Sequence, residues 1–317
     1  MKYIDINKID GFKIGNAEDK KGGTGCTTII CKKGAVAGVD VRGGGPATRE
    51  TDLLKSENMV EKIHSVVLSG GSAYGLEAGS GVMNYLEEKN IGFDVGVGVV
   101  PIVCGASLFD LIVGNAKARP TRELGYESAK NAFLDIFEKG NHGAGTGATV
   151  GKFLGPKYAM KSGLGVKAAE IGSIKVGVVV AVNALGDIYE NGKLIAGLYD
   201  RDSRKLLNTE KLMIEKAAED LNVFSGNTTI SCFLTNAILT KAQCNKLASI
   251  LHDAYARCIK PVHSSADGDT IFVMSTCQVK GTFDSIGVIG AKILEEAIVD
   301  GVKSAKTDYG FIAAEDI

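Results

Sequence analysis

Several stretches of this chain are apolar at almost every position, and they restrict its fold more than any other feature. The clearest is IKVGVVVAVN, residues 174–183, and TTISCFLTNA, residues 228–237, has an apolar centre at Cys232–Leu234 flanked by small polar side chains. A strand with one solvated face alternates apolar and polar side chains, whereas a strand covered on both faces is apolar almost throughout. We therefore expect both stretches to be strands inside a covered sheet, with a hairpin after the first whose turn is Asn191-Gly192.

Segments with helical periodicity separate these strands. In residues 240–259, apolar side chains recur three or four positions apart, which is typical of a helix with one buried face. Further helices are expected at 74–88 after a Gly70-Gly71-Ser72 turn, at 122–139 with Gly140 as its end, at 208–222 with Asn208 as N-cap, and from about 284 to 303. Strands that alternate with helices predict a layered α/β fold, and we expect residues 1–317 to form a single domain.

The charge balance and the cysteines narrow the class of protein. Lysines and arginines number 36 and aspartates and glutamates 37, so nothing favours a nucleic-acid or membrane partner. We recognise no signal peptide, and no apolar run reaches the roughly 18 residues of a membrane span. Seven cysteines without a CxxC pair are expected to be small buried side chains in a reducing compartment, which favours a cytoplasmic protein.

Familiar catalytic and cofactor motifs are missing from the sequence. Its four histidines accompany no GxSxG elbow, and neither HExxH nor a Walker A loop occurs. GAGTGATVGK, residues 143–152, has GxGxxG spacing, but no strand precedes it and no helix follows it. We interpret it as closely approaching backbone or as the wall of another site, and we expect no cofactor and no metal.

The Asn227-Thr228 pair stands where a turn meets a buried strand. Asn in the turn and Thr at the start of the strand would be ordinary local chemistry. The alternative is that the bond between them is cut, and the Thr228 hydroxyl can do this itself by attacking the preceding carbonyl. An N-terminal Thr then carries its own base, because a free α-amine has a reference pKa of about 7.7–8.0 and lies within reach of the hydroxyl. Such a nucleophile needs no histidine.

A second polar group precedes the apolar run TIFVMST, residues 270–276. Asp267 and Asp269 lie two positions apart, so on an extended backbone their side chains point the same way. Two carboxylates there can orient an ammonium or a hydroxyl and hold a proton. The DGD sequence also forms Asx turns, and a DxD pair can recruit a metal, although no other ligand cluster accompanies it.

Seven blocks in a fixed order resemble the P1 family of self-processing N-terminal-nucleophile peptidases. That family contains the L-aminopeptidase/D-esterases, the β-peptidyl aminopeptidases and the nylon-oligomer hydrolases. The blocks are RGGGPATRETDLL (42–54), LSGGSAYGLEAGSGVMNYLEE (68–88), VPIVCGASLFDL (100–111), GAGTGATVGK (143–152), VAVNALGDI (180–188), NTTISCFLTNA (227–237) and KPVHSSADGDTIF (260–272). The resemblance implies a layered α/β sandwich with a central mixed β-sheet flanked by helices, and assembly as a homo-oligomer, commonly a tetramer.

The resemblance also implies an activity. It makes Thr228 the nucleophile that is freed when the chain cuts itself after Asn227, giving a large chain of residues 1–227 and a small chain of residues 228–317. The resulting enzyme would be an amide hydrolase that acts on peptides, small amides or amide oligomers. The Thr nucleophile resembles the nylon-oligomer hydrolase branch more than the aminopeptidase branch, where the nucleophile is Ser.

Further roles follow from the same resemblance. Asp267 and Asp269 match the DxD pair that orients the nucleophile. Asn183 matches an oxyanion contact on the long apolar strand, and Lys152 matches a lysine that lines the same site. His263, in the last block, is expected only to shape its loop.

Two aromatic residues complete the expected substrate site, Tyr74 and Phe109. The nylon-oligomer hydrolases have Tyr in the block that matches ASLFDL, where this chain has Phe109. A phenol that could donate to the substrate carbonyl is therefore lost, which bears on nylon-oligomer cleavage more than on self-cleavage.

Two other functions fit the same residues. A Thr-nucleophile acyltransferase of the ornithine acetyltransferase type would pass the acyl group to an amine instead of water. A binding protein would keep the chain whole, with Thr228 only beginning a strand. Turnover that depends on an added acceptor would identify the acyltransferase. A single uncut band on a denaturing gel would identify the binding protein.

Overall fold

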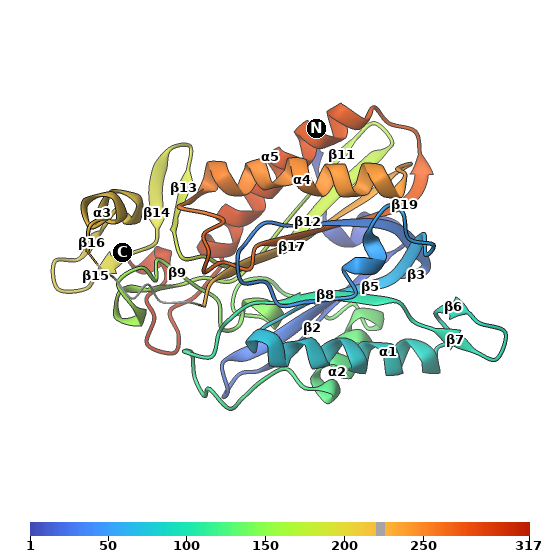
Figure 1. The fold of residues 1–317 in the computed structure, drawn as a ribbon, viewed down its shortest axis with the longest axis horizontal. Helices are drawn as coiled ribbons and strands as arrows, with labels where there is room; N and C mark the ends of the chain where they lie inside the picture. The colour runs from blue at the N-terminus through green and yellow to red at the C-terminus, as the bar shows by residue number, and fades with distance from the viewer. Residues whose placement is uncertain (220–225) are drawn as a thin grey trace.

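A ten-stranded β-sheet forms the centre of the computed structural model, which describes residues 1–219 and 226–317. Its strands are β1 (Lys2–Tyr3), β2 (Phe12–Asp19), β3 (Thr24–Val41), β4 (Thr48–Arg49), β5 (Lys62–Ser69), β8 (Val103–Ser107), β11 (Leu164–Ile171), β12 (Ile174–Asn183), β17 (Thr228–Ala237) and β19 (Thr270–Val279). Their order is β1-β11-β12-β17-β19-β3-β5-β8-β4, with β2 paired to β3 (Figure 1). The pairs β17–β19 and β5–β8 are parallel, whereas β12–β17 and β3–β5 are antiparallel, so the sheet is mixed as expected.

The described residues form five α-helices: α1 (Ala78–Glu88), α2 (Arg122–Phe133), α3 (Thr209–Glu215), α4 (Lys241–Cys258) and α5 (Phe283–Lys303). Figure 1 shows α4 and α5 on one side of the strands and α1 and α2 on the opposite side. This arrangement confirms the expected layered α/β sandwich with a central mixed sheet flanked by helices. None of the helices in the described ranges is long and apolar enough to cross a membrane.

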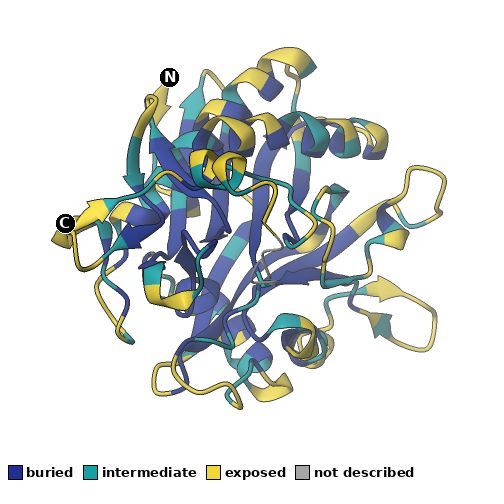
Figure 2. Cartoon of the chain, turned by 60° about the vertical axis from the view of Figure 1, so that its left-hand side comes forward, coloured by how far each residue is buried: buried dark blue, intermediate teal, exposed yellow. Residues whose placement is uncertain are grey.

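Three apolar cores separate the layers. Successive residues of a strand point to opposite faces, so β12 directs Val178 and Val180 to one core, and Val179 and Ala181 to another. The first core lies between β12, β17 and β19 and the helices α4 and α5, and the second lies between the two halves of the sheet. The third joins β3, β5 and β8 to α1 and α2. The inner strands β12 and β17 are therefore buried on both faces, and the exposed surface is mostly on the helices and loops (Figure 2).

Strand β3 connects the two halves of the sheet. Its first part pairs with β2 and β5, and its last part, from Val36 to Val41, pairs with β19. The register with β5 shifts between Ile30 and Ala35, where Gly34 has a φ of 73°. Glycine adopts this left-handed conformation without a steric cost. One strand of 18 residues thereby belongs to both halves.

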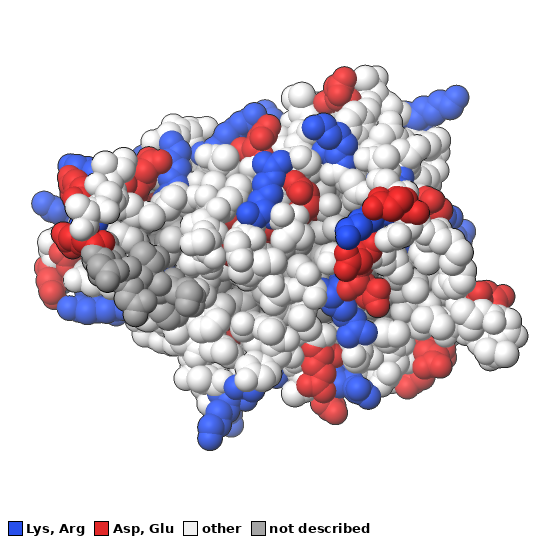
Figure 3. Space-filling view, viewed as in Figure 1, with Lys and Arg blue, Asp and Glu red and all other residues white. Residues whose placement is uncertain are grey.

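The strands at 174–183 and 228–237 have the expected bounds. The expected hairpin joins β13 (Asp187–Glu190) and β14 (Lys193–Ala196), and its turn residues Asn191 and Gly192 have φ values of 50° and 80°. Smaller strands complete the fold: β6 (Phe93–Asp94), β7 (Val99–Val100), β9 (Thr149–Val150), β10 (Met160–Lys161), β15 (Tyr199–Asp200), β16 (Lys205–Leu206) and β18 (Ile259–Lys260). Basic and acidic side chains are interspersed over the face shown in Figure 3, in line with the near-zero net charge.

Three helix boundaries were predicted wrongly, those of α2, α1 and α3. The helix expected at 122–139 ends at Phe133 and not before Gly140, because Asp135 has a φ of 56° and the Ile136 amide donates back to the Asn131 carbonyl. The helix expected from residue 74 begins at Ala78, because Ser72–Glu77 forms a 3-10 turn.

The helix expected at 208–222 is shorter than predicted. The Asn208 side chain accepts from the Lys211 amide, which confirms it as the N-cap, but α3 ends at Glu215. Residues 220–222 of that expectation lie outside the described residues.

Candidate active site

The peptide bond between Asn227 and Thr228 lies inside the protein, where β17 begins. Thr228 pairs with Asn183 on β12, and Asn227 forms a parallel bridge to Asp267. The exposed fractions of Asn227 and Thr228 are 1% and 4%. Neighbouring backbone on two sides therefore fixes the position of this bond.

Two groups approach the carbonyl oxygen of Asn227. The Thr228 hydroxyl donates to it, and the amide of Gly268 donates to it at 3.0 Å. A hydroxyl beside a carbonyl with a second donor is suited to attack, because charge that develops on the oxygen is already stabilised. Position 268 requires glycine, since an added Cβ would lie 2.8 Å from Thr228 Oγ1 and 3.0 Å from the Gly45 carbonyl oxygen.

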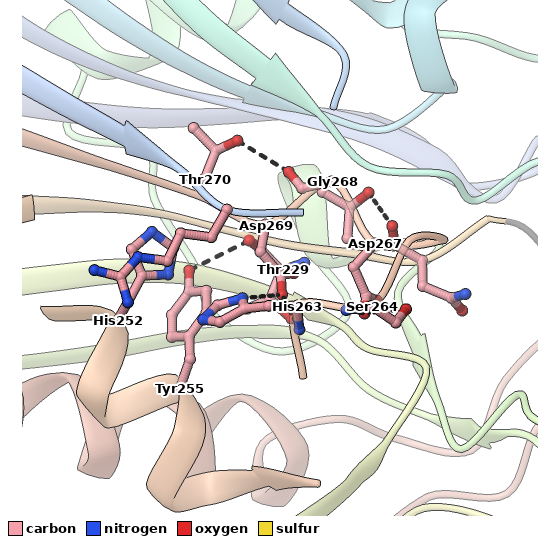
Figure 4. Close-up of polar contacts among 12 residues, drawn as sticks. Thr229, His252, Tyr255, His263, Ser264, Asp267, Gly268, Asp269 and Thr270 are labelled. Atoms are coloured by element: carbon pink, nitrogen blue, oxygen red, sulfur yellow. Dashed lines mark hydrogen bonds and ion pairs between the residues drawn. The ribbon is translucent and has the colours of Figure 1, made fainter. Parts of the chain in front are cut away.

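The two acidic residues of the DGD loop are buried beside this bond. Asp267 Oδ2 accepts from the amide and the hydroxyl of Ser264 at 2.8 and 2.6 Å. Asp269 Oδ1 accepts from the Thr229 amide at 2.7 Å, and Figure 4 shows both acidic residues near the start of β17. Among the described contacts, Asp269 bonds to the amide that follows Thr228 and Asp267 bonds to Ser264, and neither carboxylate bonds to Thr228 itself.

The glycine-rich block at 42–45 supports the DGD loop from the other side. The Arg42 amide donates to the Asp269 carbonyl at 3.0 Å, and the Gly45 amide donates to the Asp267 carbonyl at 2.8 Å. An added Cβ at Gly43 would lie 2.2 Å from the Asp267 carbonyl oxygen, so only glycine permits this approach. The block therefore positions the acidic loop through main-chain contacts.

Lys152 and Asn183 form a buried polar pair on the opposite side of β17. The Lys152 ammonium donates to Asn183 Oδ1 at 2.8 Å and to the Asn183 carbonyl at 2.9 Å, and the Thr149 amide also donates to Asn183 Oδ1 at 3.0 Å. Asn183 Nδ2 donates to the Phe109 carbonyl at 2.9 Å. In the uncleaved chain, the Asn183 donor that we expected to face an oxyanion is thus bonded to Phe109.

Burial moves the pKa values of the ionisable groups here toward neutrality. Loss of solvent lowers the pKa of Lys152 to about 7, although Asp267, Asp110 and Asp269 oppose the change. Loss of solvent, followed by the charge of Asp269, raises the pKa of Asp267 to about 6, although the Ser264 hydrogen bonds and Lys152 oppose it. Groups that titrate in this range can exchange protons near neutral pH.

A cluster of rings lies behind Asp269. His263 Nδ1 lies 2.8 Å from Asp269 Oδ2, and the His263 ring packs against His252, with centroids 4.7 Å apart. Tyr255 packs on His252, and its hydroxyl donates to the Thr229 carbonyl at 3.3 Å. Sequence reasoning missed Tyr255, whose only signal was a place on the buried face of a helix, and it missed the backbone donor of Gly268, which has no side chain to signal it.

The two expected aromatic substrate residues differ in their surroundings. The Phe109 ring packs against Gly226, where an added Cβ would lie 2.6 Å from Phe109 Cδ1. Tyr74 is 58% exposed, and its ring centroid lies 3.6 Å from the Arg119 guanidinium. Among the described contacts, Phe109 adjoins the bond at 227–228 and Tyr74 does not. Residues 1–219 and 226–317 contain no group of three or more His, Cys, Asp or Glu side chains arranged to hold a metal ion.

Comparison with known proteins places this arrangement in a family. The family described as Peptidase family S58 matches residues 5–314. An uncharacterized aminopeptidase of Mycobacterium tuberculosis (strain ATCC 25618 / H37Rv) is 37% identical over 291 residues, which cover 90% of this chain and 82% of the relative. The 6-aminohexanoate-oligomer endohydrolase of Kocuria sp. (strain KY2) is 28% identical over 309 residues, which cover 92% of this chain and 84% of the relative.

Solved structures share the fold at lower sequence identity. The L-aminopeptidase D-Ala-esterase/amidase of Ochrobactrum anthropi superposes with a TM-score of 0.70 at 16% identity, covering 98% of this chain and 90% of that one. Its structure is described as a variant of the Ntn hydrolase fold. The match over nearly the whole length, together with the 37% identical relative, establishes that this chain belongs to peptidase family S58 and is an amide- and peptide-bond hydrolase.

Proposed function

We propose that this protein is a self-processing hydrolase whose nucleophile is Thr228, freed as an N-terminal residue by cleavage of the bond after Asn227. The observation that carries the proposal is the pair of donors on the Asn227 carbonyl oxygen, the Thr228 hydroxyl and the Gly268 amide. Cleavage would give a large chain of residues 1–227 and a small chain of residues 228–317.

Self-cleavage proceeds by an N-to-O acyl shift. Thr228 Oγ1 bonds to the Asn227 carbonyl carbon, the carbon–nitrogen bond breaks, and the hydroxyl proton passes to the departing nitrogen. Water then hydrolyses the ester, which leaves a carboxylate on Asn227 and a free hydroxyl and amine on Thr228. Gly268 N–H stabilises the oxyanion in both steps. The Thr228 nitrogen is an amide before the cut, so we assign the first proton transfer to Asp267, which is bridged to Asn227 at the scissile bond and whose pKa burial raises to about 6.

Turnover uses the amine that the cut creates. The Thr228 α-amine takes the hydroxyl proton as the hydroxyl attacks a substrate carbonyl, and it returns the proton to the leaving amine. Water then hydrolyses the ester on Thr228, which releases the acid and restores the hydroxyl. Asp269 holds the start of β17 through the Thr229 amide. Lys152 and Asn183 form the opposite wall, where Asn183 becomes an oxyanion donor once its contact with Phe109 is released.

The substrates are peptides, small amides or amide oligomers. Support for the first and last of these classes comes from the names of two relatives, an aminopeptidase and a 6-aminohexanoate-oligomer endohydrolase. We also propose that the protein is cytoplasmic and forms a homo-oligomer, with a tetramer as the specific expectation. Six of its seven free cysteines are buried, which is in keeping with a reducing compartment.

Intact-mass measurement of purified protein tests this proposal. The wild type should give two masses, for residues 1–227 and 228–317, whereas Thr228→Ala should give one full-length mass and no amidase activity. Thr228→Ser keeps the hydroxyl and should still be cut. A full-length wild-type chain with amidase activity would exclude a free Thr amine as the base, and a full-length inert chain would favour a binding protein. Turnover that depends on an added amine acceptor would favour the acyltransferase.

A further inference from the structure

The glycine-rich block at 143–152 holds the side chain of Asn183. The Thr149 amide donates to Asn183 Oδ1 at 3.0 Å, and the Lys152 ammonium donates to the same oxygen at 2.8 Å. With Oδ1 held by two donors, the direction of the Asn183 amide nitrogen depends on where this block lies. The inference rests on the proposed function, in which that nitrogen becomes an oxyanion donor during turnover.

Asp110 lies against the same block, in the segment that follows β8, and is 2% exposed. A Cβ added at Gly147 would lie 2.6 Å from Asp110 Cβ and 2.8 Å from Asp110 Oδ2, so only glycine permits this approach. The Lys161 ammonium donates to the carbonyls on either side of this glycine, those of Gly145 and Ala148, at 3.2 and 3.1 Å. The part of the block around Gly147 is therefore fixed by two buried charged side chains.

The Asp110 carboxylate also joins two other turns to this block. Its Oδ2 accepts from the Thr24 hydroxyl at 2.7 Å, and its Oδ1 accepts from the Gly71 amide at 2.7 Å. A Cβ added at Gly70 would lie 1.9 Å from Asp110 Oδ2. Thr24 begins β3 and Gly70 follows β5, so turns from three distant parts of the chain meet at one carboxylate. They stay together because a buried donor that loses its acceptor is costly.

We propose that Asp110 is a positioning residue for turnover, which fixes the block at 143–152 and thereby the direction of the Asn183 amide. Self-cleavage uses the Gly268 amide, while the Asn183 amide is still bonded to the Phe109 carbonyl. Asp110 therefore serves turnover and not self-cleavage. A residue that supported only the fold would change both rates or neither, so the two reactions distinguish the roles.

Asp110→Ala and Asp110→Asn test this role. Alanine removes the acceptor of both donors, whereas asparagine can accept from the Gly71 amide and donate to the Thr24 hydroxyl oxygen. Asp110→Ala should cut itself at a rate within about threefold of the wild-type rate, measured on denaturing gels after refolding. Its cleaved form should hydrolyse alanine p-nitroanilide with kcat lowered about 10–100-fold and KM little changed, because a misdirected oxyanion donor weakens only the transition state. Asp110→Asn should recover most of the lost kcat.

Asp19→Asn is the matched control, because Asp19 accepts from the Gly22 amide in the turn before Thr24 but is exposed, and its change should leave both rates unaltered. Thr24→Val removes one donor and keeps Asp110, so it should also lower kcat more than self-cleavage, and it decides the question if Asp110→Ala does not fold. Equal losses in the two reactions, an unchanged kcat, or a cleaved wild type inert toward this substrate would overturn the inference. A wild-type chain that stays whole would refute the proposed function itself, which intact mass reports separately.

Discussion

His263 Nδ1 lies 2.8 Å from Asp269 Oδ2, and the other oxygen of that carboxylate accepts from the Thr229 amide. The imidazole is thus linked through Asp269 to Thr229, the residue that follows the nucleophile. This relationship gives His263 a positioning role. The general base of turnover is identified by the pH dependence of the rate.

The first prediction concerns the pH dependence of turnover. Because the Thr228 amine is the base, kcat/KM should rise with pH around the pKa of a free α-amine, whose reference value is about 7.7–8.0. His263→Gln should lower kcat/KM but keep this rise, because a glutamine amide can still donate to Asp269. The check is a pH profile of both proteins after cleavage. Loss of the rise in His263→Gln alone, with the fold and the chain cleavage intact, would identify the histidine as the base.

The second prediction concerns Gly268. Gly268→Ala should slow chain cleavage by about 100-fold or more, because the new Cβ would lie 2.8 Å from Thr228 Oγ1 and displace the hydroxyl from the carbonyl. Gly45→Ala is the control, because Gly45 lies in the glycine-rich block that contacts the DGD loop and an added Cβ there meets nothing closer than 3.8 Å. Band intensities on denaturing gels, followed over time after refolding, give both rates. Equal rates for the two variants would contradict the role of this approach.

The third prediction concerns the carboxylates. Asp267→Asn should slow self-cleavage by roughly 10²–10⁴-fold, because it removes the proposed proton acceptor. Asp269→Asn should slow turnover more than self-cleavage, because Asp269 holds the Thr229 amide and His263. Asp94→Asn, on the exposed β6–β7 hairpin, serves as the control. The assignment fails if Asp267→Asn is cut as fast as Asp94→Asn.

The same carboxylate sets an acid limit. Burial raises the pKa of Asp267 to about 6, so the ionised form that accepts the proton is present above that pH and is lost below it. The rate of self-cleavage should therefore fall as the pH drops through about 6, and the measurement is the rate of appearance of the small chain from pH 5 to 8. A rate that stays constant over this range would rule out Asp267 as the acceptor.

The fourth prediction concerns Lys161, which is fully buried and donates to the carbonyls of Gly145, Ala148 and Ser162. Burial lowers its folded pKa from 10.5 to about 7. Between these values the unfolded chain binds more protons than the folded chain, so the free energy of unfolding rises with pH, by at most about 1.4 kcal/mol per pH unit for one proton. Below about pH 7 both states are protonated and this contribution to the slope vanishes.

Lys161→Met should reduce that slope and should also lower stability by roughly 1–3 kcal/mol, because the buried Ser162 carbonyl loses its donor while the Gly145 and Ala148 carbonyls keep only their backbone donors. Urea unfolding from pH 7.5 to 9.5 measures both effects, with Thr228→Ala as the background so that the chain stays whole. Lys152 has a similarly lowered pKa, so some slope should remain. Identical slopes with and without Lys161 would contradict a neutralised buried lysine.

Local sequence predicted the features that depend on local contacts. The turn at Asn191-Gly192 and the N-cap at Asn208 follow from conformations and hydrogen bonds within three residues, and both are observed. The end of α2 was missed because Asp135, a residue without a strong stop signal, takes the left-handed conformation. The family blocks predicted that Thr228 and Asp267 belong to one site, but the pattern could not give the hydrogen bonds that each residue makes.

The rest of the candidate site depends on contacts between distant segments. The Gly268 donor is a main-chain group, and nothing in a sequence marks which amide faces a carbonyl 41 positions earlier. The contact between Phe109 and Gly226 joins residues more than 100 positions apart. The first depends on β17 and β19 being parallel neighbours, and the second on the segment after β8 lying beside the start of β17.

The place of β17 within the sheet has a consequence for the two products of cleavage. β17 and β19 would belong to the small chain, yet β12 pairs with one side of them and β3 with the other, and both of those strands belong to the large chain. The products would therefore be interleaved and unable to exchange partners without unfolding. Gel filtration under native conditions should give the same elution volume before and after cleavage. The large and small chains, when expressed separately, should assemble only if they are folded together.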